Sequence, residues 1–190
     1  GAHFCGFVFH PKSPRYIAPE RAAALDSALI RRVGVFVNQD AEQIMDIMKT
    51  ARLEFAQLHG NQSLDCARRI GAGKVIRVLW PDSYDSLDAM QREMDLWADS
   101  CSWFLLDAGR QGGGHGTALD WKALASLQAP RPWFLAGGLS SASLNRALEQ
   151  CTPNGIDLNS GVEAIPGQKS PQKLLAALKP LISYTPYHIA

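Results

Sequence analysis

Short apolar runs alternate with amphipathic segments along most of this chain, and this alternation limits the possible folds more than any other feature. The apolar runs are too short to prefer helix, and we expect strands at 4–9, 32–37, 55–58, 75–79, 103–106, 133–136 and 155–158. We expect the helices that follow them at 20–30, 41–50, 63–70, within 83–97, and at 121–127, 141–150 and 171–182. Strict alternation of this kind requires a parallel sheet with helices packed outside it.

The positions of the glycine pairs separate two parallel-sheet architectures, an open doubly wound sheet and a closed barrel. A dinucleotide-binding sheet carries G-x-G-x-x-G after its first strand, whereas the loop here reads HPKSPRY. The glycine-containing turns follow the last two strands instead, where (β/α)8 TIM barrels build a phosphate site. We therefore expect an α/β chain forming a (β/α)8 barrel that lacks its first βα unit. Residues 1–183 would be one barrel domain and 184–190 a C-terminal tail.

Composition excludes several classes of function. The 19 basic and 18 acidic side chains nearly cancel and form no Lys/Arg run, so we expect no nucleic-acid partner. No apolar stretch reaches the roughly 18 residues of a membrane span, and no signal peptide precedes the first strand. The four cysteines lack the short spacings of zinc or redox motifs, which favours a cytoplasmic protein. The oligomeric state cannot be predicted from the sequence.

Two turns near the C-terminus are candidates for a phosphate site. Gly138 follows a strand and precedes a serine-rich helix start, so backbone N–H groups and a helix N-terminus would face one point. Ser160 and Gly161, after the neighbouring strand, can add a hydroxyl and another N–H. The alternative is that each is only a tight turn. A phosphorylated small molecule is the ligand that these turns predict.

Asp107 directly follows the apolar run 103–106. It is followed by a loop with glycines at 109, 112, 113, 114 and 116. An apolar approach and a nearby phosphate dianion would both disfavour ionisation, so we expect the pKa of Asp107 to be raised. A carboxylic acid still protonated near neutral pH is a usable general acid. In the alternative reading Asp107 only caps the strand and the glycines form a surface turn.

The loops after the first and third expected strands carry candidate substrate-binding side chains. Arg15 lies between Pro14 and Tyr16, where a stiffened loop would hold its guanidinium to grip a carboxylate bidentately. His59 ends the run QLH and would point to the same end of the barrel as Arg15. Either residue could instead have no role in binding, as a solvated surface arginine or a structural histidine.

Taken together, the motifs of this chain resemble those of the phosphoribosylanthranilate isomerase family of tryptophan biosynthesis. In order along the chain they are PKSPRY, VGVFVN, QLHGN, FLLD with GGGHG and DW, AGGL, and DLNSGVEAIPG. The resemblance implies a (β/α)8 barrel without metal or cofactor that performs an Amadori rearrangement. It also implies that Asp107 is the general acid, that Arg15 meets the anthranilate carboxylate, and that Gly138, Ser160 and Gly161 donate to the phosphate.

The general base in this family is a cysteine in a Cys-Gly pair on the first barrel strand. Cys5 and Gly6 look like that pair, but they lead directly into the Arg15 loop, which in the family follows the second strand. We therefore expect the base on a further βα unit upstream of Gly1. Two other functions fit the glycine turns: another phosphate-binding barrel enzyme, similar to indole-glycerol phosphate synthase, or a non-catalytic barrel that binds a phosphorylated ligand.

Overall fold

The computed structural model describes residues 2–26, 30–107, 121–182 and 184, which fall into two compact bodies. The N-terminal body comprises Gly1–Val78 with Trp97–Trp103, and the C-terminal body comprises Leu79–Leu96 with Phe104–Ala190. The single domain expected over 1–183 stays a prediction. No helix among the described residues is both long and apolar enough to cross a membrane.

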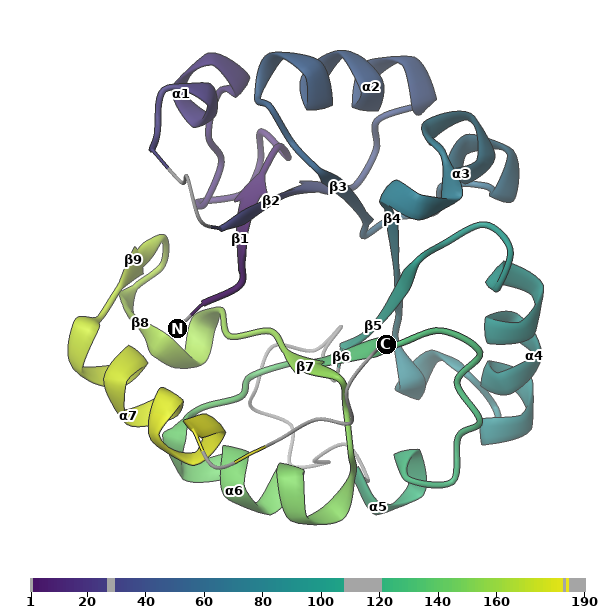
Figure 1. Ribbon diagram of the computed structural model, residues 1–190, viewed down its shortest axis with the longest axis vertical. Coiled ribbons are helices and arrows are strands. Elements are labelled where there is room, and N and C mark those ends of the chain that lie inside the picture. Colours follow the sequence, from purple (N-terminus) through teal and green to yellow (C-terminus); the bar gives the residue numbers. More distant parts are fainter. Residues whose placement is uncertain (1, 27–29, 108–120, 183, 185–190) are drawn as a thin grey trace. The chain divides into compact units, whose positions relative to one another are not determined.

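In the part of the N-terminal body that the structure describes, strands alternate with helices (Figure 1). In chain order these elements are β1 (Phe4–Val8), α1 (Pro19–Ala23), β2 (Arg31–Phe36), α2 (Ala41–Thr50), β3 (Phe55–Leu58), α3 (Leu64–Ile70) and, apart from its last residue, β4 (Val75–Leu79). A short 3-10 helix, η1 (Ala72–Lys74), joins α3 to β4. Neighbouring strands pair in parallel and in chain order, with Gly6 opposite Val33 and Val33 opposite Phe55.

The C-terminal body continues the same alternation and adds a hairpin. Its elements are η2 (Pro81–Ser83), α4 (Leu87–Trp97, apart from its last residue), β5 (Trp103–Asp107, apart from its first residue), α5 (Trp121–Leu124), β6 (Trp133–Ala136), α6 (Ser141–Gln150), β7 (Gly155–Ile156), η3 (Ser160–Val162), β8 (Glu163–Ile165), β9 (Gln168–Lys169) and α7 (Pro171–Ile182). Strands β5, β6 and β7 are parallel and in chain order, whereas β8 and β9 form an antiparallel pair. Among the described residues the two bodies hold seven parallel strands, and this α/β arrangement confirms the expected fold class at this level.

Side-chain caps determine where several helices begin. Asp40 precedes α2 and accepts a hydrogen bond from the Gln43 N–H (2.9 Å), while the Gln43 side chain accepts from the Asp40 N–H (3.1 Å). This reciprocal capping box satisfies two of the N–H groups that a helix start leaves unpaired. The apolar face of α2, which includes Ile44 and Met48, is buried. Ser63 caps α3 through the Cys66 N–H at 3.2 Å.

A buried arginine joins the C-terminal ends of two helices to the sheet. The side chain of Arg32, at the second position of β2, donates to the carbonyl oxygens of Ala22, Leu25 and Ala51. Its guanidinium also lies 4.5 Å from the centre of the Phe7 ring. Helix C-termini carry partial negative charge, so one cation there satisfies orphan carbonyls of both α1 and α2.

Three expected elements extend at least two residues beyond the end that is observed. Helix α1 ends at Ala23 rather than near residue 30, and Arg32 donates to the carbonyl groups of Ala22 and Leu25 at this end. Helix α5 ends at Leu124 rather than 127, and its last turn continues with tighter bonds such as Leu127 N–H to Leu124 O (3.2 Å). Strand β7 is two residues long because the chain turns into η3 soon afterwards.

Candidate functional site

Two carboxyl groups of the C-terminal body lie in one row across the ends of its parallel strands. Asp107, the last residue of β5, is in register with Ala136 of β6. The N–H of Asp157, just after β7, donates to Leu135 O at 2.9 Å and continues the register, which sets Asp157 beside Ala136. Residues in register on parallel strands project to the same face. Because Ala136 has only a methyl group, little side-chain bulk separates the two carboxyl groups.

The environment of Asp157 favours its neutral form. Burial and, secondarily, the negative charge of Asp107 raise the pKa of Asp157 from 3.8 to about 6, although Lys169 acts in the opposite direction. A negative charge nearby makes ionisation of Asp157 less favourable, in the same direction as its burial. The Asp157 carboxyl group therefore stays protonated to a higher pH than an isolated carboxyl group would.

Asp157 is a candidate site residue that the sequence patterns do not single out. It precedes Leu158 and the second candidate phosphate turn, within the strand that the sequence predicts over 155–158. The available signal was the same as for Asp107, a carboxylate where an apolar strand ends. Only the strand register reveals that these two positions, fifty residues apart in the chain, share one row.

The two candidate phosphate turns contact each other. Gly137 and Gly138 have φ of +95° and +64°, a conformation that residues with a Cβ rarely adopt. A Cβ placed on Gly161 would lie 2.0 Å from the carbonyl oxygen of Leu139, so the second turn packs directly on the backbone of the first. The structure thus brings Gly138, Ser160 and Gly161 together on the side of the strand ends where Asp107 lies.

A helix begins at the first of these turns. The Ser140 N–H, at the N-cap of α6, donates to the Ser143 hydroxyl at 3.1 Å. The first N–H groups of α6 carry the partial positive charge of a helix N-terminus, which suits an anion. Ser160, the first residue of η3, is exposed, so its hydroxyl is open to a ligand.

The Arg15 loop in the N-terminal body is held by its own turns. The Ser13 N–H donates to His10 O (2.9 Å), the Tyr16 N–H donates to Ser13 O (3.1 Å), and the Arg15 N–H donates to the Ser13 hydroxyl (3.1 Å). Tyr16 returns to lie beside Val8 in a parallel bridge. The half-buried Arg15 is therefore fixed close to the C-terminal end of β1.

His59 follows β3 at the same edge of this body. Its N–H donates to Phe36 O at 2.8 Å, and its Nδ1 lies 3.4 Å from the Gln57 side-chain nitrogen. The next residue, Gly60, packs so tightly that a Cβ there would lie 1.8 Å from Val37 O. Arg15 and His59 thus stand at the ends of β1 and β3 with β2 between them, as the sequence predicts for strand-end side chains.

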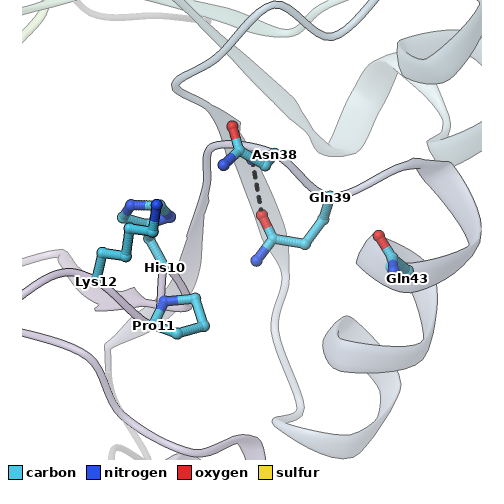
Figure 2. Close-up of a pocket in the computed structure, with 6 residues that line it drawn as sticks. All are labelled: His10, Pro11, Lys12, Asn38, Gln39 and Gln43. Atoms are coloured by element: carbon cyan, nitrogen blue, oxygen red, sulfur yellow. Dashed lines mark hydrogen bonds between the residues drawn. The ribbon is translucent and has the colours of Figure 1, made fainter.

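A pocket of about 310 Å³ lies beside the Arg15 loop (Figure 2). His10, Pro11 and Lys12 line it from the loop after β1, and Asn38, Gln39 and Gln43 line it from the start of α2 and the turn before it. The Gln39 side chain joins the two loops, because its nitrogen donates to Phe9 O at 2.6 Å and its oxygen accepts from the Asn38 N–H at 3.2 Å. The pocket shares the strand-end edge with Arg15.

Cys5 lies on the helix-covered face of the sheet. It is in register with Arg32, and Phe7, two residues along the same strand, contacts the Arg32 guanidinium. Side chains two apart on a strand project to the same face, so Cys5 projects with Phe7 toward α1 and α2. Its half-buried thiol also sits at the second residue of β1, well before the strand end.

Some predicted features fall outside the described residues. The glycine loop after Asp107, with glycines 109, 112, 113, 114 and 116, lies in 108–120, and most of the tail lies in 185–190. Within the described residues, no group of three or more His, Cys, Asp or Glu side chains is placed to hold a metal ion.

Comparison with known proteins gives one consistent result. The family model described as N-(5'phosphoribosyl)anthranilate (PRA) isomerase matches residues 1–179. The chain is 56% identical to N-(5'-phosphoribosyl)anthranilate isomerase of Desulfovibrio desulfuricans over 178 residues, which cover 94% of this chain and 84% of the relative.

Solved structures agree. The crystal structure of phosphoribosyl anthranilate isomerase from Thermotoga maritima matches with a TM-score of 0.84 and 32% identity, over 97% of this chain and 90% of that one. A second isomerase structure, in complex with reduced 1-(o-carboxyphenylamino)-1-deoxyribulose 5-phosphate, matches with a TM-score of 0.78 and 31% identity over 94% and 87% of the two chains.

Proposed function

This chain belongs to the N-(5'-phosphoribosyl)anthranilate isomerase family, and we propose how the residues at its strand ends divide the work of that reaction. The enzyme converts N-(5-phosphoribosyl)anthranilate into 1-(2-carboxyphenylamino)-1-deoxyribulose 5-phosphate in tryptophan biosynthesis. The observation that carries the assignment of roles is the arrangement of the C-terminal body, where a pair of carboxyl groups and two interlocked glycine turns lie at the ends of β5, β6 and β7.

Asp107 is the general acid. Its carboxyl group gives a proton to the ring oxygen of the ribose, the bond between that oxygen and C1 breaks, and the anthranilate nitrogen lone pair forms the iminium ion. Loss of the C2 proton to a base then gives the enolamine, which tautomerises to the aminoketose. The position of Asp107 at the C-terminal end of β5, on the same side as the two glycine turns, supports this role.

The turns at Gly138 and at Ser160–Gly161 hold the phosphate of the substrate. Backbone N–H groups suit a phosphate because several can converge on one oxygen, and glycine permits close approach. The contact between Gly161 and Leu139 O supports a single site made by both turns. Since a phosphate at this position binds equally in substrate and transition state, these contacts govern KM rather than kcat.

Arg15 binds the anthranilate carboxylate, and His59 contacts the substrate from the same edge of the N-terminal body. The turns that anchor the Arg15 backbone support this role, because a fixed guanidinium loses less freedom on binding a carboxylate. A phosphorylated small molecule is thus the ligand that these groups bind.

The four cysteines, none of which forms a disulfide, support a reducing compartment such as the cytoplasm.

Substitution of the acid and of the anion contact should separate their roles. In the full natural chain we expect Asp107→Asn to lower kcat at least about 100-fold with little change in KM, because protonation is needed only in the transition state. Arg15→Ala should raise KM while inorganic phosphate still competes with substrate. Asp46→Asn, an exposed carboxylate on α2, is the matched control. Near-normal kcat in Asp107→Asn would refute the assignment.

We further propose that β1 corresponds to the second strand of the family's eight-stranded barrel, and that the cysteine base precedes it. The projection of Cys5 toward the helices supports this correspondence, since a base must face the substrate at the strand ends. Cys5→Ser in the full natural chain should therefore keep kcat within about threefold of normal. A loss of about 100-fold or more, the size expected for removal of a general base, would identify Cys5 as the base instead.

A further inference from the structure

The hairpin β8–β9 follows immediately after the second phosphate turn. Its turn is Pro166-Gly167, with Gly167 at φ +86°, the left-handed position that favours glycine. The hairpin register sets Glu163 directly opposite Lys169. These two residues therefore face each other a few positions after Ser160 and Gly161.

Glu163 provides a buried anionic anchor. Its side chain is only 4% exposed, and its Oε1 accepts from the Lys169 ammonium (3.0 Å) and from the Gly167 N–H (3.2 Å). The Glu163 backbone is held as well, because the Lys173 ammonium at the start of α7 donates to its carbonyl at 2.7 Å. A buried carboxylate needs such partners, and they fix its position.

Lys169 extends this anchor to the phosphate turn. Besides Glu163, its ammonium donates to the backbone oxygen of Asn159 (2.9 Å) and to the Asn159 side-chain oxygen (2.6 Å). An ammonium has three N–H groups, and these three acceptors match them. Asn159 immediately precedes Ser160, and its carbonyl also accepts from the Val162 N–H (3.3 Å), the bond that closes η3.

We propose that Glu163 and Lys169 are positioning residues for phosphate binding, with Lys169 holding Asn159 so that the Ser160–Gly161 turn keeps its shape. Neither side chain needs to touch the phosphate. The inference rests on the proposed phosphate site and explains how that site is kept rigid, since binding turns require supporting contacts of this kind. The Ser170 N–H to Val162 O bond (2.8 Å) attaches the same turn to the cap of α7.

Two charge-changing variants distinguish positioning from simple attraction between Lys169 and the phosphate. Lys169→Met should raise both KM and the inhibition constant of inorganic phosphate by about tenfold or more, with kcat within about threefold. Glu163→Gln removes a negative charge near the anion. If attraction alone mattered, this variant would bind phosphate more tightly. If Glu163 positions Lys169, phosphate binding should weaken.

The experiment measures competition by inorganic phosphate in the full natural chain, with Lys179→Met, an exposed lysine on α7, as the matched control. Weakened binding in both Glu163→Gln and Lys169→Met, with the control unchanged, supports the proposal. Unchanged or tighter binding in Glu163→Gln overturns it, and this variant decides the question even if Lys169→Met fails to fold. Absence of competition in the unmodified enzyme would instead refute the phosphate site itself.

Discussion

Replacing Asp157 by asparagine should make the protein more stable at neutral pH. At pH 7.5 the folded chain must keep this carboxyl group ionised although its pKa is raised to about 6 by burial and by the charge of Asp107. In the unfolded chain the pKa of this carboxyl group is 3.8. Folding therefore opposes ionisation, and asparagine, which has a similar shape but no charge, removes that cost.

The size of the effect follows from the two pKa values. Because the folded pKa is the higher one, the group imposes no cost below pH 3.8, where both states are protonated, and its full cost above pH 6. The variant should exceed the natural chain in unfolding free energy by about 1 kcal/mol at pH 4.5 and by about 3 kcal/mol at pH 7.5. Asp157 keeps some exposed surface, so solvent screening makes these values upper estimates.

Urea denaturation at pH 4.5, 5.5, 6.5 and 7.5, followed by circular dichroism, measures this difference. Asp46→Asn on the exposed face of α2 serves as the control for removal of any one carboxylate. The gap between Asp157→Asn and the natural chain should widen as pH rises, while the gap for the control stays constant. A gap that does not change with pH would mean that the Asp157 carboxyl group is solvated, and it would refute the reasoning from its burial and from the charge of Asp107.

Two further substitutions test the packing around the candidate site and the sheet. Gly161→Ala should raise KM and the inhibition constant of phosphate about tenfold or more, because the new Cβ would lie 2.0 Å from Leu139 O and force the two turns apart. Gly73→Ala, with open space around it, is the control and should leave both constants unchanged. Arg32→Met should lower the free energy of unfolding by about 3 kcal/mol, because the carbonyl groups of Ala22, Leu25 and Ala51 lose their buried donor. Urea denaturation measures this change. Arg68→Met, at an exposed position, is the control and should change the free energy of unfolding little.

The element order could be predicted from the sequence because local signals were strong. The bounds expected for α2, β3, β4, β6, α6 and α7 are those observed. In α2 the capping box of Asp40 and Gln43 is encoded within four residues, so no distant contact is needed to start the helix. The placement of Asp107 and His59 at strand ends followed from the same local patterns, although Asp107 is itself part of β5.

Features that depend on distant contacts could not be predicted in this way. The placement of Asp107 and Asp157 in one row follows from strand register, and the hydrogen bonds at the end of α1 come from Arg32 on the next strand. The hairpin β8–β9 carries a Pro-Gly turn signal, but its strands of three and two residues are too short for an alternating pattern to appear. The roles of individual site residues therefore still rest on the proposed substitutions.

The position of Arg32 has a consequence for how this protein can change during evolution. Its guanidinium binds the C-terminal ends of α1 and α2 near the N-terminal end of β2. Arg15, the pocket and His59 lie at the C-terminal ends of β1, β2 and β3. With the proposed roles of Arg15 and His59, stability and substrate recognition lie at opposite ends of the same strands. New substrate specificities can be selected by exchanging side chains at 10–16 and 37–38, outside the Gln39 contacts and the Asp40 cap, while the anchoring edge stays intact. A library randomised at those positions should yield far more folded members than one randomised around residue 32.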